Sequence, residues 1–209
     1  MANQTNQGKY IAVLTFDANV CVDKSINCQI RFEGKATSIK TAFTEKILQL
    51  YGTITNKREK VKLAYFEHNR IESERVLFNA VSNACDRYHL PKYITNGIYQ
   101  KCRENMTKFF SQLAPLLDCF SVEEISKASS FLQAHESKIK KSGSMSEPAD
   151  DSDCKLLVGT SKQNEELKGL LSADGHFTGI PEEIMNEYCV HIVDTKNPIS
   201  IDSFIELTK

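Results

Sequence analysis

Glycine is scarce in this chain, with nine among 209 residues, and most of the nine stand alone. Loops that cradle phosphates or dinucleotides need glycines clustered at fixed spacing, and this sequence has no such cluster. It also lacks the turn that presents a serine nucleophile and the histidine pair of a zinc-protease helix. These absences predict that the chain uses no cofactor, and they leave no catalytic motif from which an activity would follow.

Long apolar runs are absent too, so no stretch approaches the length that spans a bilayer. Residues 1 to 8 are polar and do not have the pattern of a secretory signal. The composition, 41% hydrophobic and 25% charged, is typical of globular proteins. We therefore expect a soluble protein of the cytoplasm, or of the nucleus, that has no membrane partner.

The seven cysteines include no Cys-x-x-Cys pair, which argues against the common zinc motifs. Two Cys/His pairs, Cys85 with His89 and Cys189 with His191, have workable ligand spacing, but two ligands do not make a zinc site. Without a secretory signal we expect reduced thiols, which behave as small apolar side chains. The sequence therefore predicts no metal site.

One enzymatic reading stays open, in which a cysteine thiol is the nucleophile and a histidine is its base. Any chain with seven cysteines and five histidines offers such combinations by chance, so a non-enzymatic protein is favoured. The candidates are Cys21, Cys154 or Cys189 as the nucleophile and His176 or His191 as the base.

Basic and acidic side chains are unevenly distributed, although the net charge of the chain is only −1. Residues 1 to 141 carry 21 Lys and Arg against 14 Asp and Glu, a net of +7, whereas residues 142 to 209 carry 5 against 13, a net of −8. This asymmetry indicates an anionic partner for the basic part, or docking of the acidic part on it. Both interpretations predict sensitivity to salt.

Apolar and alternating segments predict a small β-β-α-β unit at the N-terminus. Residues 9 to 16 form a compact apolar run, and residues 26 to 32 alternate polar with apolar, so the two are expected to pair as an antiparallel hairpin. Helical spacing over residues 39 to 51 predicts a helix that Gly52 ends. Alternation over residues 61 to 66 predicts a third strand.

Three helices are predicted over residues 70 to 141, which have helical periodicity and little strand punctuation. Pro91 should separate the first helix from the second, whose apolar stripe runs from residue 94 to residue 117. Ser121 and Glu124 have the spacing of a capping box that opens the third. The stripes must be covered, by one another or by a second copy of the chain. The predicted self-association interface consists of Ile98, Met106, Phe109 and Leu113.

The remainder of the chain is predicted to be a linker followed by a small acidic region. Residues 142 to 153 are small, polar and acidic, and we interpret their aspartates as solvating a flexible linker. The short elements expected beyond the linker are a strand at 155 to 158, a helix at 162 to 171, a turn at 172 to 179, a helix at 181 to 188 and a strand at 189 to 193.

The predicted fold class is therefore α+β, a small N-terminal β-β-α-β unit followed by a predominantly helical bundle. Three parts are expected: a main domain at residues 1 to 141, the linker at 142 to 153 and a small mixed C-terminal region at 154 to 209.

Nucleic-acid binding is predicted from basic side chains that alternate with aromatic ones. Such a surface neutralises phosphates and offers rings on which bases stack. Interleaved acidic residues weaken the field, and an ordinary solvated surface is the competing interpretation. The predicted nucleic-acid-binding residues are Lys57, Arg58, Lys60, Lys62, Arg87, Lys92, Lys101, Arg103 and Lys108.

From the sequence alone, we expect a non-enzymatic regulatory or accessory factor, of a kind that viruses also encode, which self-associates and binds RNA or another polyanion through its basic part. The acidic C-terminal region would modulate this binding or recruit a protein partner. The first alternative is an assembly subunit that contacts only proteins. The second is an enzyme with the cysteine-centred site described above.

Overall fold

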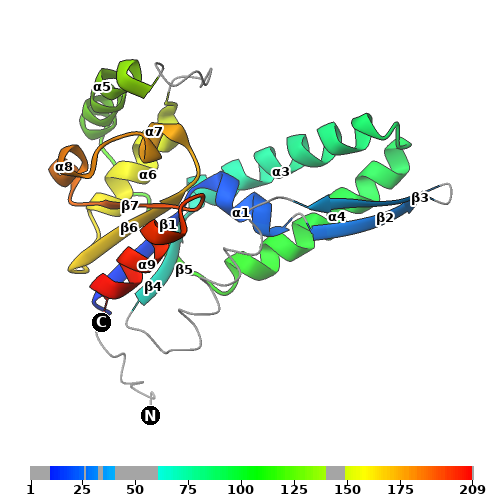
Figure 1. The fold of residues 1–209 in the computed structure, drawn as a ribbon, viewed down its shortest axis with the longest axis horizontal. Helices are drawn as coiled ribbons and strands as arrows, with labels where there is room; N and C mark the ends of the chain where they lie inside the picture. The colour runs from blue at the N-terminus through cyan, green and yellow to red at the C-terminus, as the bar shows by residue number, and fades with distance from the viewer. Residues whose placement is uncertain (1–9, 26, 33–34, 41–60, 140–148, 209) are drawn as a thin grey trace, which may run out of the picture.

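The structure is a computed structural model, and it describes residues 10 to 25, 27 to 32, 35 to 40, 61 to 139 and 149 to 208. Within these residues, five strands form a parallel sheet in the order β5-β4-β1-β6-β7 (Figure 1). Their bounds are β1 Ala12–Phe16, β4 Val61–Phe66, β5 Ala114–Leu116, β6 Leu167–Ser172 and β7 His191–Asp194.

Helices follow most of the strands, and an antiparallel hairpin of β2 and β3 lies apart from the parallel sheet. None of the helices in the described ranges is both long and apolar enough to cross a membrane. The bounds are α1 Ala18–Ser25, β2 Asn27–Phe32, β3 Lys35–Lys40, α3 Glu67–Arg87, α4 Lys92–Phe110, α5 Val122–Ile139, α6 Asp151–Ser161, α7 Gly175–Thr178, α8 Glu182–Met185, the 3-10 helix η2 Asn186–Tyr188 and α9 Pro198–Leu207.

Both faces of the sheet are covered. Leu170 and Leu171 are consecutive residues of β6 and are fully buried, but they belong to different hydrophobic clusters. Successive residues of a strand point to opposite faces, so the two clusters lie on opposite sides of the sheet. One cluster includes residues of α1, α3, α4 and α9, and the other includes residues of α5, α6 and α7. The parallel sheet is therefore wound with helices on both sides.

The predicted combination of α and β structure with a large helical part is confirmed, but the predicted pairing of β1 is wrong. β1 does not form a hairpin with residues 26 to 32; it lies between β4 and β6 and runs parallel to both. All five residues of β1 are buried, which is typical of a central parallel strand covered on both faces. The described part of the strand expected at 26 to 32 is β2, which pairs instead with β3. The start of the helix predicted at 39 to 51 is wrong, because Ile39 belongs to β3. The rest of the predicted helix at 39 to 51 lies outside the described residues.

The three predicted helices are confirmed as α3, α4 and α5. The Ser121–Glu124 capping box is present: the Glu124 amide donates to Ser121 Oγ at 3.2 Å, and the Ser121 amide donates to Glu124 Oε2 at 2.8 Å. However, α4 ends at Phe110, and Ala114–Leu116 forms β5. Pro115 is tolerated there because β5 is an edge strand, where a missing amide donor faces away from the ladder.

The helices α3 and α4 together form what we call the arm. They project from the sheet, with the β2–β3 hairpin alongside (Figure 1). The chain reverses between them at Tyr88 to Pro91, where His89 has a φ of 53°. The side of α3 that is buried carries Leu77, Val81 and Cys85 at four-residue spacing, and it packs against α4 and α1.

Two C-terminal elements differ from the predicted ones. Residues 155 to 158, predicted as a strand, belong to α6, and most of the predicted helix at 162 to 171 is loop and β6. The local pattern was misleading because residues 156 to 160 of α6 are all buried, so this apolar run resembles that of a strand. The division into a main domain, linker and C-terminal region stays a prediction, but β6 pairs with β1, so strands from the first and third ranges share one sheet.

Candidate functional site

The strand order places a topological switch point at the carboxyl ends of β1 and β6, where a crevice is expected. The chain leaves β1 toward β4 and β5 on one side, and β6 and β7 occupy the other side, so the order of strands reverses between β1 and β6. In open parallel sheets, the loops that diverge at such a point leave a crevice where ligands bind. Asp17 follows β1, Ser172 ends β6, and Asp174 follows two residues later.

Asp17 is the buried residue at the centre of this crevice, with 5% of its surface exposed. The hydroxyl of Ser172 donates a hydrogen bond to Asp17 Oδ2 at 2.8 Å, and the Asn19 amide donates to Oδ1 at 3.4 Å. Burial raises the pKa of Asp17 to about 6, and the nearby Asp174 and Glu72 carboxylates contribute to the increase against the lowering effect of Ser172. A carboxyl group with so high a pKa is characteristic of functional sites.

Helix α6 supplies two more carboxylates at its N-terminus. Asp150 caps the helix by accepting hydrogen bonds from the amides of Ser152 and Asp153, and the Asp150 amide donates to Asp153 Oδ2 at 3.0 Å. Burial raises the pKa of Asp153 to about 8, and repulsion from Asp17, Asp150 and Asp174 adds to the effect of burial. The charges of Asp17 and Asp153 therefore interact, although the two residues are 136 positions apart in sequence.

A fifth carboxylate, that of Glu72, comes from α3. Its Oε2 accepts a hydrogen bond from the hydroxyl of Ser152, which connects the second turn of α3 with the first turn of α6. The charge of Glu72 also contributes to the raised pKa of Asp17. We call Asp17, Glu72, Asp150, Asp153 and Asp174 the carboxylate cluster.

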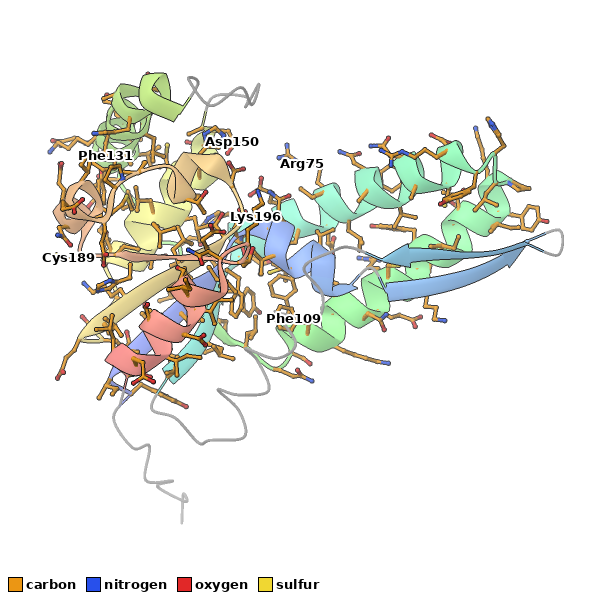
Figure 2. The ribbon with its side chains drawn as sticks, in the orientation of Figure 1. Arg75, Phe109, Phe131, Asp150, Cys189 and Lys196 are labelled. Carbon is orange, nitrogen blue, oxygen red and sulfur yellow. The ribbon has the colours of Figure 1, made fainter. Side chains whose placement is uncertain are left out.

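Two cations border the carboxylate cluster. The guanidinium of Arg75 lies 3.4 Å from a Glu72 oxygen and is 67% exposed. The ammonium of Lys196, in the segment after β7, donates to the carbonyl of Ala173 at 2.7 Å, between Ser172 and Asp174 in the chain. Figure 2 labels Arg75, Asp150 and Lys196 around this end of the sheet. The site thus combines buried negative charge with exposed positive charge at its rim.

The carboxylate cluster has the chemistry of a hard-cation site. Mg²⁺ takes oxygen ligands and is usually held by only one or two carboxylates, its other positions being filled by water and substrate phosphates. No group of three or more His, Cys, Asp or Glu side chains in the described ranges is placed to hold a metal ion, and Asp17, Asp153 and Glu72 each accept a hydrogen bond from the protein. The fit is therefore to a cation with a small number of protein ligands.

The sequence-predicted basic residues separate into groups. Lys57, Arg58 and Lys60 lie outside the described residues. Lys62 is in β4, and its ammonium lies 3.4 Å from Glu165. Arg87 and Lys92 flank the turn at the end of the arm, whereas Lys101, Arg103 and Lys108 lie on α4, where Arg103 is 3.5 Å from Glu74.

The predicted self-association residues are covered within one chain. Ile98, Met106, Phe109 and Leu113 are 7%, 1%, 3% and 6% exposed and belong to the cluster that includes β1 and α1. The Phe109 ring lies edge-on to Phe16, with centroids 5.7 Å apart. These four side chains have little surface left for a second copy, and self-association itself stays a prediction.

The predicted cysteine-centred site gains no support from the geometry. Cys21 and Cys154 are buried, and burial together with Asp153 and Asp151 raises the pKa of the Cys154 thiol to about 11. A raised pKa keeps the thiol protonated and weakly nucleophilic. Cys189 is exposed, and the candidate base His191 lies 3.0 Å from Glu182, while His176 is buried and lies 3.6 Å from Asp174.

The sequence analysis did not identify the carboxylate cluster. It assigned Asp150 and Asp153 to a solvated linker and Asp174 to a turn. The available signal was that Asp17 and Asp174 each follow shortly after an apolar run, which is where parallel strands place functional side chains. Recognising that signal requires Leu167–Ser172 to be identified as a strand.

Comparison of the chain with models of protein families, with curated proteins and with solved structures finds no match.

Proposed function

We propose that this protein is a divalent-cation-dependent nuclease that hydrolyses phosphodiester bonds in RNA. The observation that carries the proposal is the carboxylate cluster, five acidic side chains from four segments of the chain that gather at the carboxyl ends of β1 and β6. This proposal replaces the expectation of a non-enzymatic protein without a cofactor, and it retains the expected RNA partner.

The electrostatics of the cluster favour a divalent cation. Buried carboxylates that repel one another are costly when ionised, and they avoid the cost by holding protons, as the raised pKa values of Asp17 and Asp153 indicate. A bound Mg²⁺ or Mn²⁺ offsets the same repulsion near neutral pH and displaces those protons. Asp17 and Asp174 are the two ligands that we assign, because Asp17 follows β1, Asp174 follows β6, and the charge of Asp174 contributes to the raised pKa of Asp17.

Phosphodiester hydrolysis is a reaction suited to such a site. Carboxylate-held divalent cations polarise phosphoryl oxygens and lower the pKa of a bound water. The oxygen of the water forms a bond to phosphorus, the bond from phosphorus to one ribose oxygen breaks, and that oxygen takes up a proton. Arg75 and Lys196 at the rim are placed to bind phosphates on either side of the reacting one.

A polyanionic substrate is supported by the charge of the arm. Residues 75 to 108 carry six Lys and Arg against two Asp and Glu. A small phosphorylated metabolite would not need the excess of basic residues on α4, which carries Lys92, Lys101, Arg103 and Lys108 against Glu104. A long RNA strand does, since each phosphate that it contributes gains from a nearby cation.

The test is cleavage of a fluorescent single-stranded RNA by the purified chain with Mg²⁺ or Mn²⁺. We expect cleavage that EDTA abolishes and that Asp17→Asn or Asp174→Asn lowers by at least a hundredfold. Asp202→Asn, which removes an exposed carboxylate on α9, is the matched control and should cleave like the wild type.

The same variants separate the alternatives. RNA binding without cleavage, and without any calorimetric signal for Mg²⁺ or Mn²⁺, would leave the non-enzymatic RNA-binding function proposed from the sequence. Cleavage that survives in Asp17→Asn would show that the activity comes from a contaminant or from another site. If the chain neither binds nor cleaves RNA, the protein-assembly function becomes the better proposal.

A further inference from the structure

The arm has exposed aromatic side chains that the fold does not use. Phe78, Tyr88 and Tyr93 are 51%, 52% and 73% exposed, and Phe78 meets Tyr99 of α4 edge-on with ring centroids 5.4 Å apart. Apolar rings of this size are usually buried, because each contributes a large area to the core. Their exposure along one projection indicates a surface that a partner covers.

Basic side chains accompany these rings from the site outward. Arg75 and Phe78 are three residues apart on α3 and so are neighbours on the helix surface, next to Glu72 of the carboxylate cluster. At the far end, the exposed Arg87, Tyr88, Lys92 and Tyr93 lie within six residues around the reversal of the chain. Rings alternating with cations are the pattern that holds single-stranded nucleic acid, by stacking on bases and pairing with phosphates.

We propose that single-stranded RNA runs from the carboxylate cluster along the arm, held by Arg75 and Phe78 beside the cluster and by Arg87, Tyr88, Lys92 and Tyr93 at the far end. The inference rests on the proposed nuclease function for the reaction at the carboxylate cluster. It adds that the RNA is single-stranded and that it lies along the arm. Bases in a duplex are stacked and paired, so their faces are closed to these rings.

Charge favours RNA over a second copy of the chain as the occupant. The part of the arm from residue 75 to residue 108 has a net charge of +4 from its Lys, Arg, Asp and Glu. Two such surfaces facing each other would place like charges together, which costs association energy. RNA brings the opposite charge and also the flat faces that the rings require.

The length of the arm sets a length for the RNA. Glu72 and Arg87 are 15 residues apart on one helix, a separation of about 22 Å at 1.5 Å per residue. A stacked strand rises about 3.4 Å per nucleotide, so roughly seven nucleotides connect the cluster with the far end of the arm. An RNA of four nucleotides is too short to contact both.

The first experiment measures binding without cleavage. In the Asp17→Asn background, a fluorescein-labelled 16-nucleotide oligouridine is titrated by anisotropy against Tyr88→Ala/Tyr93→Ala and against Tyr10→Ala. Tyr10 is 46% exposed and precedes β1, so it lies at the opposite end of the sheet and is a matched control. Loss of base stacking should weaken binding by about tenfold or more for the double variant, since a stacked base contributes on the order of 1–3 kcal/mol.

The second experiment measures how the loss depends on RNA length and pairing. The measured quantity is a ratio: kcat/KM for the 16-nucleotide RNA divided by kcat/KM for a 4-nucleotide RNA, in protein that retains Asp17. This ratio should fall by about tenfold in Tyr88→Ala/Tyr93→Ala and stay constant in Tyr10→Ala. A 16-base-pair duplex should bind the parent protein more weakly than the single strand. Circular dichroism of each variant checks that the exposed substitutions leave the fold intact.

Defined results would overturn the proposal. Equal RNA affinity of the Tyr88→Ala/Tyr93→Ala and Tyr10→Ala variants would do so, as would a dimer that the double variant dissociates with unchanged RNA affinity. Failure of the proposed nuclease function would give a different result. The wild type would then cleave no RNA of any length, while the arm variants would still lose affinity for RNA.

Discussion

Asp17 illustrates how the position of one side chain sets its chemistry. The residue follows a strand buried on both faces, so its carboxylate lies at the end of the core and not on an open loop. Ser172 supplies a hydrogen bond, but other carboxylates surround the site and oppose ionisation. At the residue scale, the arrangement is unfavourable to the folded chain at neutral pH unless a cation or protons compensate it.

This conflict predicts a pH dependence of stability. The pKa of Asp17 is raised from 3.8 to about 6, so between these values the folded chain holds a proton that the unfolded chain has released. The free energy of unfolding therefore falls as pH rises through this interval. In EDTA, Asp17→Asn, which cannot ionise, should have nearly the wild-type Tm at pH 4 and exceed it at pH 8. The difference should be on the order of 2 kcal/mol, or about 4–8 °C.

Addition of Mg²⁺ at pH 8 should remove much of that difference, because a cation stabilises the ionised Asp17 of the wild type only. Thermal unfolding monitored by circular dichroism gives both measurements, and Asp202→Asn serves as the surface control. If the Tm of the wild type and the Tm of Asp17→Asn differ by the same amount at every pH from 4 to 8, the result would contradict the raised pKa of Asp17.

At the scale of elements, helix α6 must pack closely on the sheet to place Asp150 and Asp153. Gly159 lies where α6 crosses the sheet, and a Cβ atom there would come within 2.6 Å of the Phe66 ring and 2.8 Å of the Phe120 ring. Thr160, the next residue, shares a buried hydrogen bond of 2.8 Å with Thr15 of β1. Gly159 and the hydrogen bond between Thr15 and Thr160 together determine how closely α6 packs on the sheet.

Gly159→Ala should therefore destabilise the protein by about 1–3 kcal/mol, because two packed rings must move to accept one methyl group. Gly97→Ala is the matched control, since a Cβ at position 97 meets nothing within 4 Å. It should stabilise α4 by up to about 1 kcal/mol through helix propensity. Urea denaturation measures both changes, and destabilisation of equal size in the two variants would refute this account of α6.

At the scale of the whole molecule, the sheet depends on both ends of the chain. β6 and β7 come from the last 43 residues of the sequence, and β6 pairs with β1 along its full length. Phe204 of α9 is 2% exposed and lies against Gly169 of β6. The acidic C-terminal part is therefore built into the core while it contributes charge to the site.

A chain that ends at residue 141 should consequently fail to fold. Without β6, the central strand β1 loses one neighbour and becomes an exposed apolar edge. We expect weak protection from proteolysis, aggregation and no cooperative thermal transition, whereas the full chain unfolds cooperatively. A truncated protein with a sharp transition would instead support an independent domain at residues 1 to 141.

Much of the helical structure follows from the sequence alone. The apolar spacing in α4, the Pro91 break and the Ser121–Glu124 capping box are local features, which depend on residues three or four positions apart. The strands β4 and β7 also follow from local alternation or β-branched content. The sequence likewise determines the excess of basic residues that the arm carries.

Only the tertiary structure decided the neighbours of β1, the nature of residues 154 to 171 and the location of the carboxylate cluster. Strand pairing depends on contacts more than 100 residues apart, and a buried helix and a buried strand can have the same apolar run. Asp17, Glu72, Asp153 and Asp174 have no shared spacing in sequence. They come together because parallel strands end at one edge of the sheet and because the second turn of α3 meets the first turn of α6 there.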